Sequence, residues 1–217
     1  DEFRIKTPVS EQARKLLDKY VEERMDQHTK QPLHEALRNK DKTIIEKVLR
    51  HCESNGYQTS LVRECGMLYE SISDCEMALS VSIQQMNEEF LQRSLDMYNG
   101  VKYIVSGQTP PQVVQAQQLI EKIQRAVQML TSALRSLNHE HLKKAIEYSQ
   151  QFGFNDPKVS AAKKKYNQVM QIRDSLTNAK KTLNLAELKE GLAQAKDIGY
   201  ECDLVDECRL LLWRCQR

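Results

Sequence analysis

Three adjacent residues, His139, Glu140 and His141, form the one cluster in the sequence whose side-chain types suggest catalysis or metal binding. Two histidines on a helix share a metal when they stand four residues apart, because such residues lie on one face. His139 and His141 are two residues apart, so on a helix their side chains point about 200° away from one another. Asn138, a residue type that favours helix starts, precedes them. We therefore interpret the cluster as the polar first turn of a helix and predict no catalytic residue and no metal site.

The six cysteines do not form a metal-binding pattern either. No two of them have Cys-x-x-Cys spacing, and Cys202, Cys208 and Cys215 lack the paired short spacings of zinc ligands. A cysteine also serves as a small hydrophobic side chain. We therefore predict buried free thiols, which favour a reducing compartment such as the cytoplasm.

The sequence offers no loop for binding phosphate groups. Neither G-x-x-x-x-G-K-[ST] nor G-x-G-x-x-G occurs in it. It contains no run of about 18 apolar residues, so no membrane span is expected. Charged residues make up 29% of the chain and hydrophobic residues 40%, which is typical of a well-solvated helical protein. We predict a protein that is not an enzyme and has no cofactor.

A pattern of residues recurs along the chain, with copies that start near Ala36, Ser82, Ala133 and Ala179. Five residues after each start stands an Asp or Asn, which favours the N-cap of a helix. Twenty residues after the start, three of the copies have a glycine followed by an aromatic residue, which is typical of a helix end. The recurring positions are Asp41, Asn87, Asn138 and Asn184 at the starts, and Gly56, Gly153 and Gly199 at the ends.

Each copy therefore predicts a short helix of about 14 residues, followed by a long helix of about 27 residues. Thr109-Pro110 and Asp156-Pro157 predict an N-cap and the first residue of two of these long helices. Apolar residues recur every seven positions in the long spans, as they also do in coiled coils. Capped turns interrupt this stripe, so we favour packing between neighbouring helices of one chain over dimerising coils.

We predict an all-α fold, an elongated stack of about four helix-turn-helix repeats that start near residues 36, 82, 133 and 179. Residues 1–217 would form a single repeat domain. Residues 1–35 would be a lead-in helix with the character of the end of a preceding unit, and Gln31-Pro32 predicts a bend in it.

The segment Leu142-x-x-Ala145-Ile146, followed by Gly153-Phe154, resembles the two-helix units of HEAT-like and armadillo-like solenoids. The 46-residue period is also similar to theirs, and the resemblance covers nearly the whole chain. It implies a scaffold, or an adaptor of the cytoskeleton or of transport. The unequal helix lengths leave a second arrangement open, in which consecutive small bundles share each long helix, as in spectrin-like rods.

The second copy is five residues longer than the others, in a turn that ends at Thr109-Pro110-Pro111. Loops inserted on a regular scaffold often carry binding residues. We predict that Val101, Tyr103 and Ile104 contact a partner there. The alternative is a tolerated surface insertion.

Lysine is concentrated in the second half of the chain, where 12 Lys and Arg residues stand against 7 Asp and Glu between Val127 and Tyr200. A basic surface there would attract nucleic acid or an acidic filament such as a microtubule. The lysine runs lack interleaved aromatic residues, so a solvated helix face is the simpler interpretation and nucleic acid is the less favoured partner. The candidate residues are Lys143, Lys144, Lys163, Lys164, Lys165, Lys180 and Lys181.

The end of the chain stays apolar, with Trp213 beside Leu211 and Leu212. Terminal repeats normally turn a polar face outward, so we expect either that the parent chain continues or that another molecule packs on Trp213. The sequence predicts a protein–protein interaction scaffold or adaptor from a larger protein, which binds a partner peptide or helix on its repeat surface. Filament or nucleic-acid binding through the lysines is the alternative.

Overall fold

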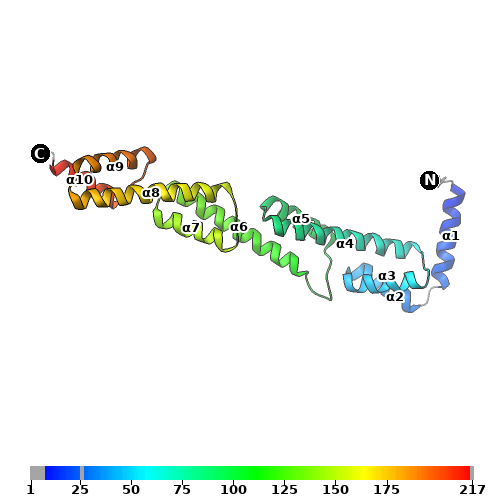
Figure 1. Cartoon of the computed structure of the whole chain (residues 1–217). Helices are drawn as coiled ribbons and strands as arrows, with labels where there is room; N and C mark the ends of the chain where they lie inside the picture. The colour runs from blue at the N-terminus through cyan, green and yellow to red at the C-terminus, as the bar shows by residue number, and fades with distance from the viewer. Residues whose placement is uncertain (1–7, 25–26, 216–217) are drawn as a thin grey trace. The chain divides into compact units, whose positions relative to one another are not determined.

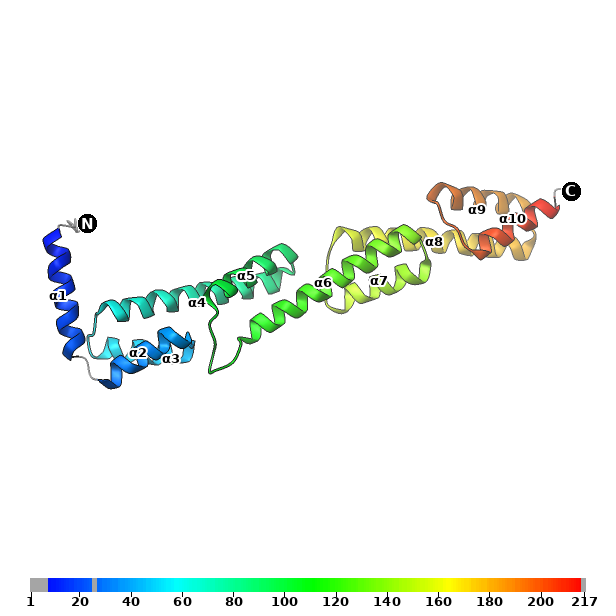
Figure 2. The same ribbon diagram turned by 180° about the vertical axis from the view of Figure 1, so that it is seen from behind.

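The computed structural model describes residues 8–24 and 27–215, and its named elements are all helices. The all-α fold predicted from the sequence is therefore confirmed. The chain forms two compact units, residues 1–120 and 121–217, with the division inside helix α6 (Pro111–Ser136). Figures 1 and 2 show the helices of each unit from opposite sides. The single domain over residues 1–217 stays a prediction.

In the first unit, one long helix packs against three short helices. Helix α4 packs against α2 and α3 along its first half and against α5 along its second half, and α2 and α3 also pack on each other (Figure 1). Helix α1 precedes them. The bounds are α1 Pro8–Arg24, α2 Gln27–Asn39, α3 Lys42–Ser54, α4 Ser60–Gln85 and α5 Glu88–Val101.

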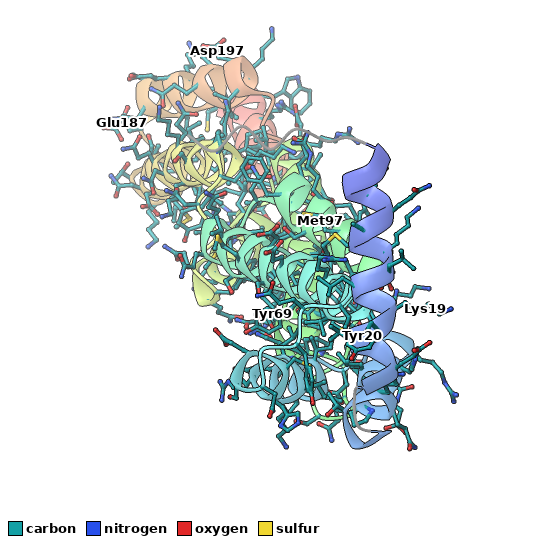
Figure 3. The ribbon with its side chains drawn as sticks, turned by 90° about the vertical axis from the view of Figure 1, so that its right-hand side faces the viewer. Lys19, Tyr20, Tyr69, Met97, Glu187 and Asp197 are labelled. Carbon is teal, nitrogen blue, oxygen red and sulfur yellow. The ribbon has the colours of Figure 1, made fainter. Side chains whose placement is uncertain are left out.

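The second unit has the same organisation around α8. Helix α7 packs on the first half of α8, and α9 and α10 pack on its second half and on each other (Figure 2). The bounds are α7 His139–Gln151, α8 Pro157–Thr182, α9 Leu185–Ile198 and α10 Asp203–Cys215. Exposed charged residues such as Glu187 and Asp197 cover the outer side of α9 (Figure 3).

Long and short helices alternate from α3 to α9. Helices α4, α6 and α8 have 26 residues each, and α3, α5, α7 and α9 have 13 or 14. Consecutive helices pack against each other, which is compatible with a helical repeat. Four leucines at equivalent positions, three residues before the start of each copy, are fully buried. They are Leu33, Leu79, Leu130 and Leu176.

The predicted N-caps of the short helices are confirmed. The side-chain oxygen of Asn138 accepts hydrogen bonds from the backbone amides of Glu140 at 2.9 Å and His141 at 3.2 Å. Asp41, Asn87 and Asn184 cap α3, α5 and α9 in the same way. The residue before each cap adopts a left-handed backbone with φ near 50°, although none of these residues is glycine. These residues are Lys40, Met86, Leu137 and Leu183.

The predicted helix ends at Gly56, Gly153 and Gly199 are also confirmed, with φ of 69°, 74° and 71°. Only glycine adopts this left-handed conformation at little cost, because it has no Cβ. The amide after the glycine donates back to the last turn, as from Phe154 to the carbonyl of Ser149 at 3.0 Å. This six-to-one hydrogen bond is the mark of a Schellman ending.

Two local features differ from the prediction or extend it. Helix α2 continues through Pro32, so Gln31-Pro32 does not end the helix. Pro32 is the sixth residue of α2, so the hydrogen bond that it cannot donate would reach a carbonyl in the first turn of the helix. Helix α6 begins at Pro111, one residue later than Thr109-Pro110 predicted.

None of the helices in the described ranges is long and apolar enough to cross a bilayer.

Candidate functional site

The two histidines of the cluster lie in different surroundings. A ring nitrogen of His139 lies 2.7 Å from the guanidinium of Arg173 on α8, and burial together with the Arg173 charge lowers the pKa of His139. His141 is exposed on the other side of the first turn. Among the residues that the structure describes, no group of three His, Cys, Asp or Glu side chains could hold a metal ion.

Four of the six cysteines are buried as free thiols. The Cys65 thiol lies 3.7 Å from the carbonyl oxygen of Leu33, and the Cys208 thiol lies 3.9 Å from that of Leu176. The two contacts occupy corresponding places in the two units. Burial raises the pKa of Cys65 to about 11, with smaller contributions from Cys52 and Glu64. These thiols therefore stay protonated near neutral pH and serve as packing groups.

The inserted turn is held against its own unit. Tyr103 is fully buried, and its ring packs edge-on against Tyr98 with 5.5 Å between the ring centroids. The prediction that Tyr103 contacts a partner therefore needs correction, because its side chain has no exposed surface. Tyr103 stands 21 residues after the start of its copy, where Phe154 and Tyr200 are also buried. Lys102, with φ of 52°, takes the place of the helix-ending glycine, so the pattern was hidden from the sequence.

Val101 and Ile104 are half-buried, and both take part in backbone hydrogen bonds to the corner between α2 and α3. The carbonyl of Val101 accepts from the Lys40 ammonium at 2.7 Å. The Ile104 amide donates to Lys40, and its carbonyl accepts from the Lys42 amide. These hydrogen bonds fasten the turn to the neighbouring corner.

The predicted lysines lie on α7 and α8. Lys165 is half-buried, and the other six are exposed. Two of the seven already form ion pairs, Lys143 with Glu147 at 3.9 Å and Lys180 with Glu207 at 2.6 Å. Trp213, on α10, keeps 51% of its surface exposed.

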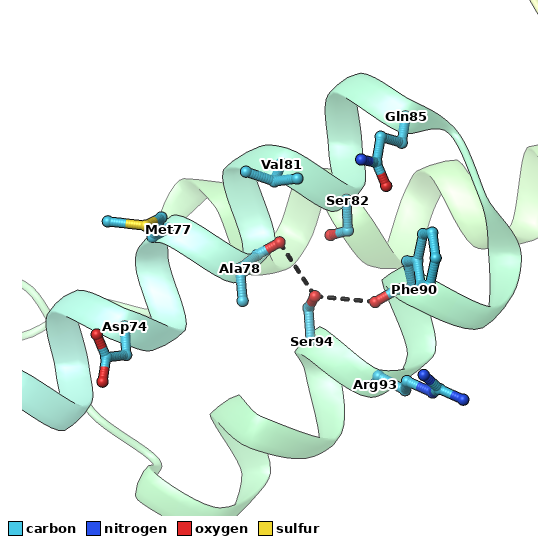
Figure 4. Close-up of a pocket in the computed structure, with 9 residues that line it drawn as sticks. All are labelled: Asp74, Met77, Ala78, Val81, Ser82, Gln85, Phe90, Arg93 and Ser94. Carbon is cyan, nitrogen blue, oxygen red and sulfur yellow. Dashed lines mark hydrogen bonds between the residues drawn. The ribbon is translucent and has the colours of Figure 1, made fainter.

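The sequence-based prediction missed an apolar groove between α4 and α5. Its walls are Met77 and Val81 on α4 and Phe90 at the start of α5, which remain 67%, 46% and 44% exposed. Figure 4 shows these side chains around the mouth of the groove. The groove has a volume of about 450 Å³. Single exposed apolar residues are normal on a protein surface, whereas here three of them border one hollow.

Small residues form the floor of this groove. The hydroxyl of Ser94 donates to the carbonyl oxygens of Phe90 at 2.8 Å and Ala78 at 3.1 Å (Figure 4). Ser94 and Ser82 are buried. Because the serine hydroxyls are satisfied inside the protein, the floor presents mainly carbon to the groove. Asp74 and Arg93 stand at the rim.

The same groove exists 51 residues later, between α6 and α7, with a different lining. Its volume is about 330 Å³, and Gln128, Ser132 and His141 stand where the first groove has Met77, Val81 and Phe90. Between α8 and α9 the corresponding residues are all polar. They are Asp174, Asn178 and Glu187. The fold therefore does not require apolar side chains at these positions.

A signal for this groove was present in the sequence. Met77 and Val81 lie outside the sevenfold stripe of Cys65, Ile72 and Leu79 that forms the buried face of α4. The second copy therefore differs from the later copies, because it has apolar residues outside the buried stripe where the later copies have polar ones. Aligning the copies position by position would have identified them.

Comparisons with protein-family models, with curated proteins and with solved structures find no match to this chain.

Proposed function

We propose that the chain is a non-enzymatic protein–protein interaction scaffold, built of about four helix pairs, and that the α4–α5 groove is its main contact surface. Helix pairs that bury one face on their neighbours leave grooves on the other face. Grooves of this kind suit a partner helix or peptide.

The single observation that carries this proposal is the apolar lining of the α4–α5 groove. Met77, Val81 and Phe90 expose hydrocarbon to water, while the corresponding residues of the later copies are polar. Exposed apolar surface lowers solubility and does nothing for the fold. Burying it under a partner yields about 25 cal/mol per Å² of apolar area.

The test transplants the polar lining of the fourth copy into the second. The polar-groove variant carries Met77→Asp, Val81→Asn and Phe90→Glu, which are the residues that α8 and α9 hold at the same places. Because all three sites are exposed, we expect an unchanged melting temperature. Proteins that co-purify with the natural chain should be depleted at least tenfold on the variant, as counted by quantitative mass spectrometry.

The matched control is Met67→Asp, which introduces charge at a 59% exposed methionine of α4 outside the groove. It should retain the partners. Each partner that depends on the groove is then purified and its affinity for the two variants measured directly. Equal recovery of all partners on the natural chain and the polar-groove variant contradicts the proposal.

The alternative, binding of an acidic filament or nucleic acid, draws on the composition of α8. This helix carries seven Lys and Arg residues and one acidic residue, Asp174. The alternative has less support, since Lys180 and Lys143 are engaged in ion pairs. Co-sedimentation with microtubules and binding to a labelled oligonucleotide should weaken steeply as salt rises if the lysines act. Substituting Lys163 and Lys164 with Gln should abolish such binding.

A further inference from the structure

The helices that form the α4–α5 groove are acidic. Together they carry seven carboxylates and two cationic side chains, Arg63 and Arg93. Arg93, at the rim, is already paired with Glu89 four residues earlier. Asp74 lines the groove, and Glu70, one helical turn before it, is exposed on the same stripe of α4. Glu76 is paired with Lys42 of α3, so the excess negative charge beside the hydrocarbon walls comes from Glu70 and Asp74.

The corresponding rims in the second unit do not combine these features. Arg125 and Lys144 replace Asp74 and Arg93 beside the α6–α7 groove, whose lining combines Gln128, Ser132 and His141 with Met129 and Ala133. On α8 and α9, Gln171 stands at the position of Asp74, and Asp174 and Glu187 stand at the positions of Met77 and Phe90. An acidic rim around an apolar lining is thus particular to α4 and α5 among these three helix pairs.

The packing within each unit indicates the shape of the occupant. Helices α2, α3 and α4 pack pairwise, and so do α8, α9 and α10, so a helix laid between two others is the arrangement that this chain uses. From Asp74 to Gln85 the groove follows roughly 16 Å of α4, at 1.5 Å per residue. That length matches about three turns of a partner helix, with apolar anchors every third or fourth residue.

We propose that the α4–α5 groove receives a basic amphipathic helix, whose apolar face packs on Met77, Val81 and Phe90 and whose flanking Lys or Arg residues face Glu70 and Asp74. This proposal rests on the proposed function and adds the chemistry of the partner to it. Methionine walls suit such a ligand, because an unbranched thioether side chain adapts to different apolar shapes. The acidic rim selects against acidic helices through like-charge repulsion.

The experiment uses three fluorescent peptides and the full chain. The first is an amphipathic helix with leucines every third or fourth residue and lysines beside them. The second has glutamate in place of every lysine, and the third is the lysine peptide with a central proline that breaks the helix. Fluorescence anisotropy gives the dissociation constant of each at low and at physiological salt.

We expect the lysine peptide to bind at least tenfold more tightly than the other two, with an affinity that falls as salt rises. The polar-groove variant should lose binding, although it gains two carboxylates, so its loss cannot come from weaker charge attraction. Glu70→Gln with Asp74→Asn, the neutral-rim variant, should weaken the lysine peptide several-fold. Glu35→Gln with Glu53→Gln changes the net charge equally at exposed sites on α2 and α3 and should have little effect.

The outcomes separate this proposal from the function on which it rests. If the lysine and glutamate peptides bind equally and both lose binding on the polar-groove variant, the groove is a docking site and the basic partner is wrong. If the lysine peptide binds the natural chain and the polar-groove variant equally, or does not bind, the proposed occupant is overturned. The proposed function is then judged by the co-purification experiment alone.

Discussion

The carboxylate of Asp41 accepts a hydrogen bond from the backbone amide of Gly107 at 2.9 Å, across 66 residues of sequence. Its other oxygen accepts from the amides of Ser106 at 3.2 Å and Thr43 at 2.9 Å. One side chain therefore starts α3 and also holds the inserted turn of the second copy. The corresponding Asn138 and Asn184 only cap their helices.

Asp41→Ala should destabilise the first unit far more than an ordinary cap mutation does. Losing an N-cap costs about 1 kcal/mol. Losing hydrogen bonds to a charged group adds about 1.5–3 kcal/mol, so we expect a total of about 3 kcal/mol in urea unfolding followed by circular dichroism. The control Asn138→Ala should cost about 1 kcal/mol, because it removes a cap alone. Equal losses in the two variants would show that the turn contributes nothing.

The stability supplied by Asp41 should depend on pH. Burial raises the pKa of its carboxyl, but hydrogen bonds from Gly107, Thr43, Ser106 and Ile44 together lower it below the usual value of 3.8. Because the carboxyl has a lower pKa in the folded state than in the unfolded state, its ionised form stabilises the fold. This stabilisation is complete above the unfolded-state pKa and is lost as the pH falls through the folded-state pKa. The difference in unfolding free energy between the natural chain and Asp41→Asn should therefore be constant near neutral pH and shrink below about pH 4. A difference that grows on acidification would contradict this assignment.

Gly191→Ala should destabilise the second unit. A Cβ at Gly191 on α9 would lie 2.8 Å from a methyl carbon of Leu176, which is fully buried on α8. Overpacking of this kind costs about 1–3 kcal/mol. Gly66→Ala is the matched control, since nothing lies within 4 Å of a Cβ there and alanine is the better helix former by about 1 kcal/mol. The two variants should shift the melting temperature in opposite directions, and a stabilising Gly191→Ala would refute the close packing.

Removing the hydroxyl of Tyr103 should not lower the stability of the first unit. This buried oxygen has no hydrogen-bond partner in the described part of the chain, so Tyr103→Phe should be neutral or stabilising by up to about 1 kcal/mol. Tyr103→Ser instead empties a packed site and should cost about 3–5 kcal/mol. A substitution that unfolds the unit cannot test partner binding, so Tyr103 is a poor site for such an experiment. A large loss with Tyr103→Phe would mean that the hydroxyl has a partner.

The sequence predicted the parts of this fold that depend on neighbouring residues. Asp or Asn before each short helix and glycine after three of them are local signals, because a cap bonds within its own turn. The left-handed Lys102 carried no such signal, since lysine seldom adopts that conformation. Pro32 also carried a signal, yet α2 continues through it.

The candidate site was less predictable, because it depends on contacts between distant segments. The hydrogen bond from the Gly107 amide to Asp41 joins residues 66 positions apart. No spacing rule links an N-cap residue to a turn so far along the chain. Met77 and Phe90 come from two helices, and only their packing brings them to one groove. Six of the seven lysines and Trp213 are exposed, yet exposure alone does not distinguish a binding surface from a solvated one.

Each unit contains a buried thiol whose alkylation rate measures how often the structure around it opens. The thiolate is the form of cysteine that attacks an alkylating reagent, and burial raises the pKa of both Cys65 and Cys208. Cys65 belongs to the first unit and Cys208 to the second, so the alkylation rate of each one reports how often its own surroundings open. The exposed Cys215 sets the rate for an unprotected thiol. The opening rates of the two units can thus be measured separately at cysteines that the natural sequence already contains.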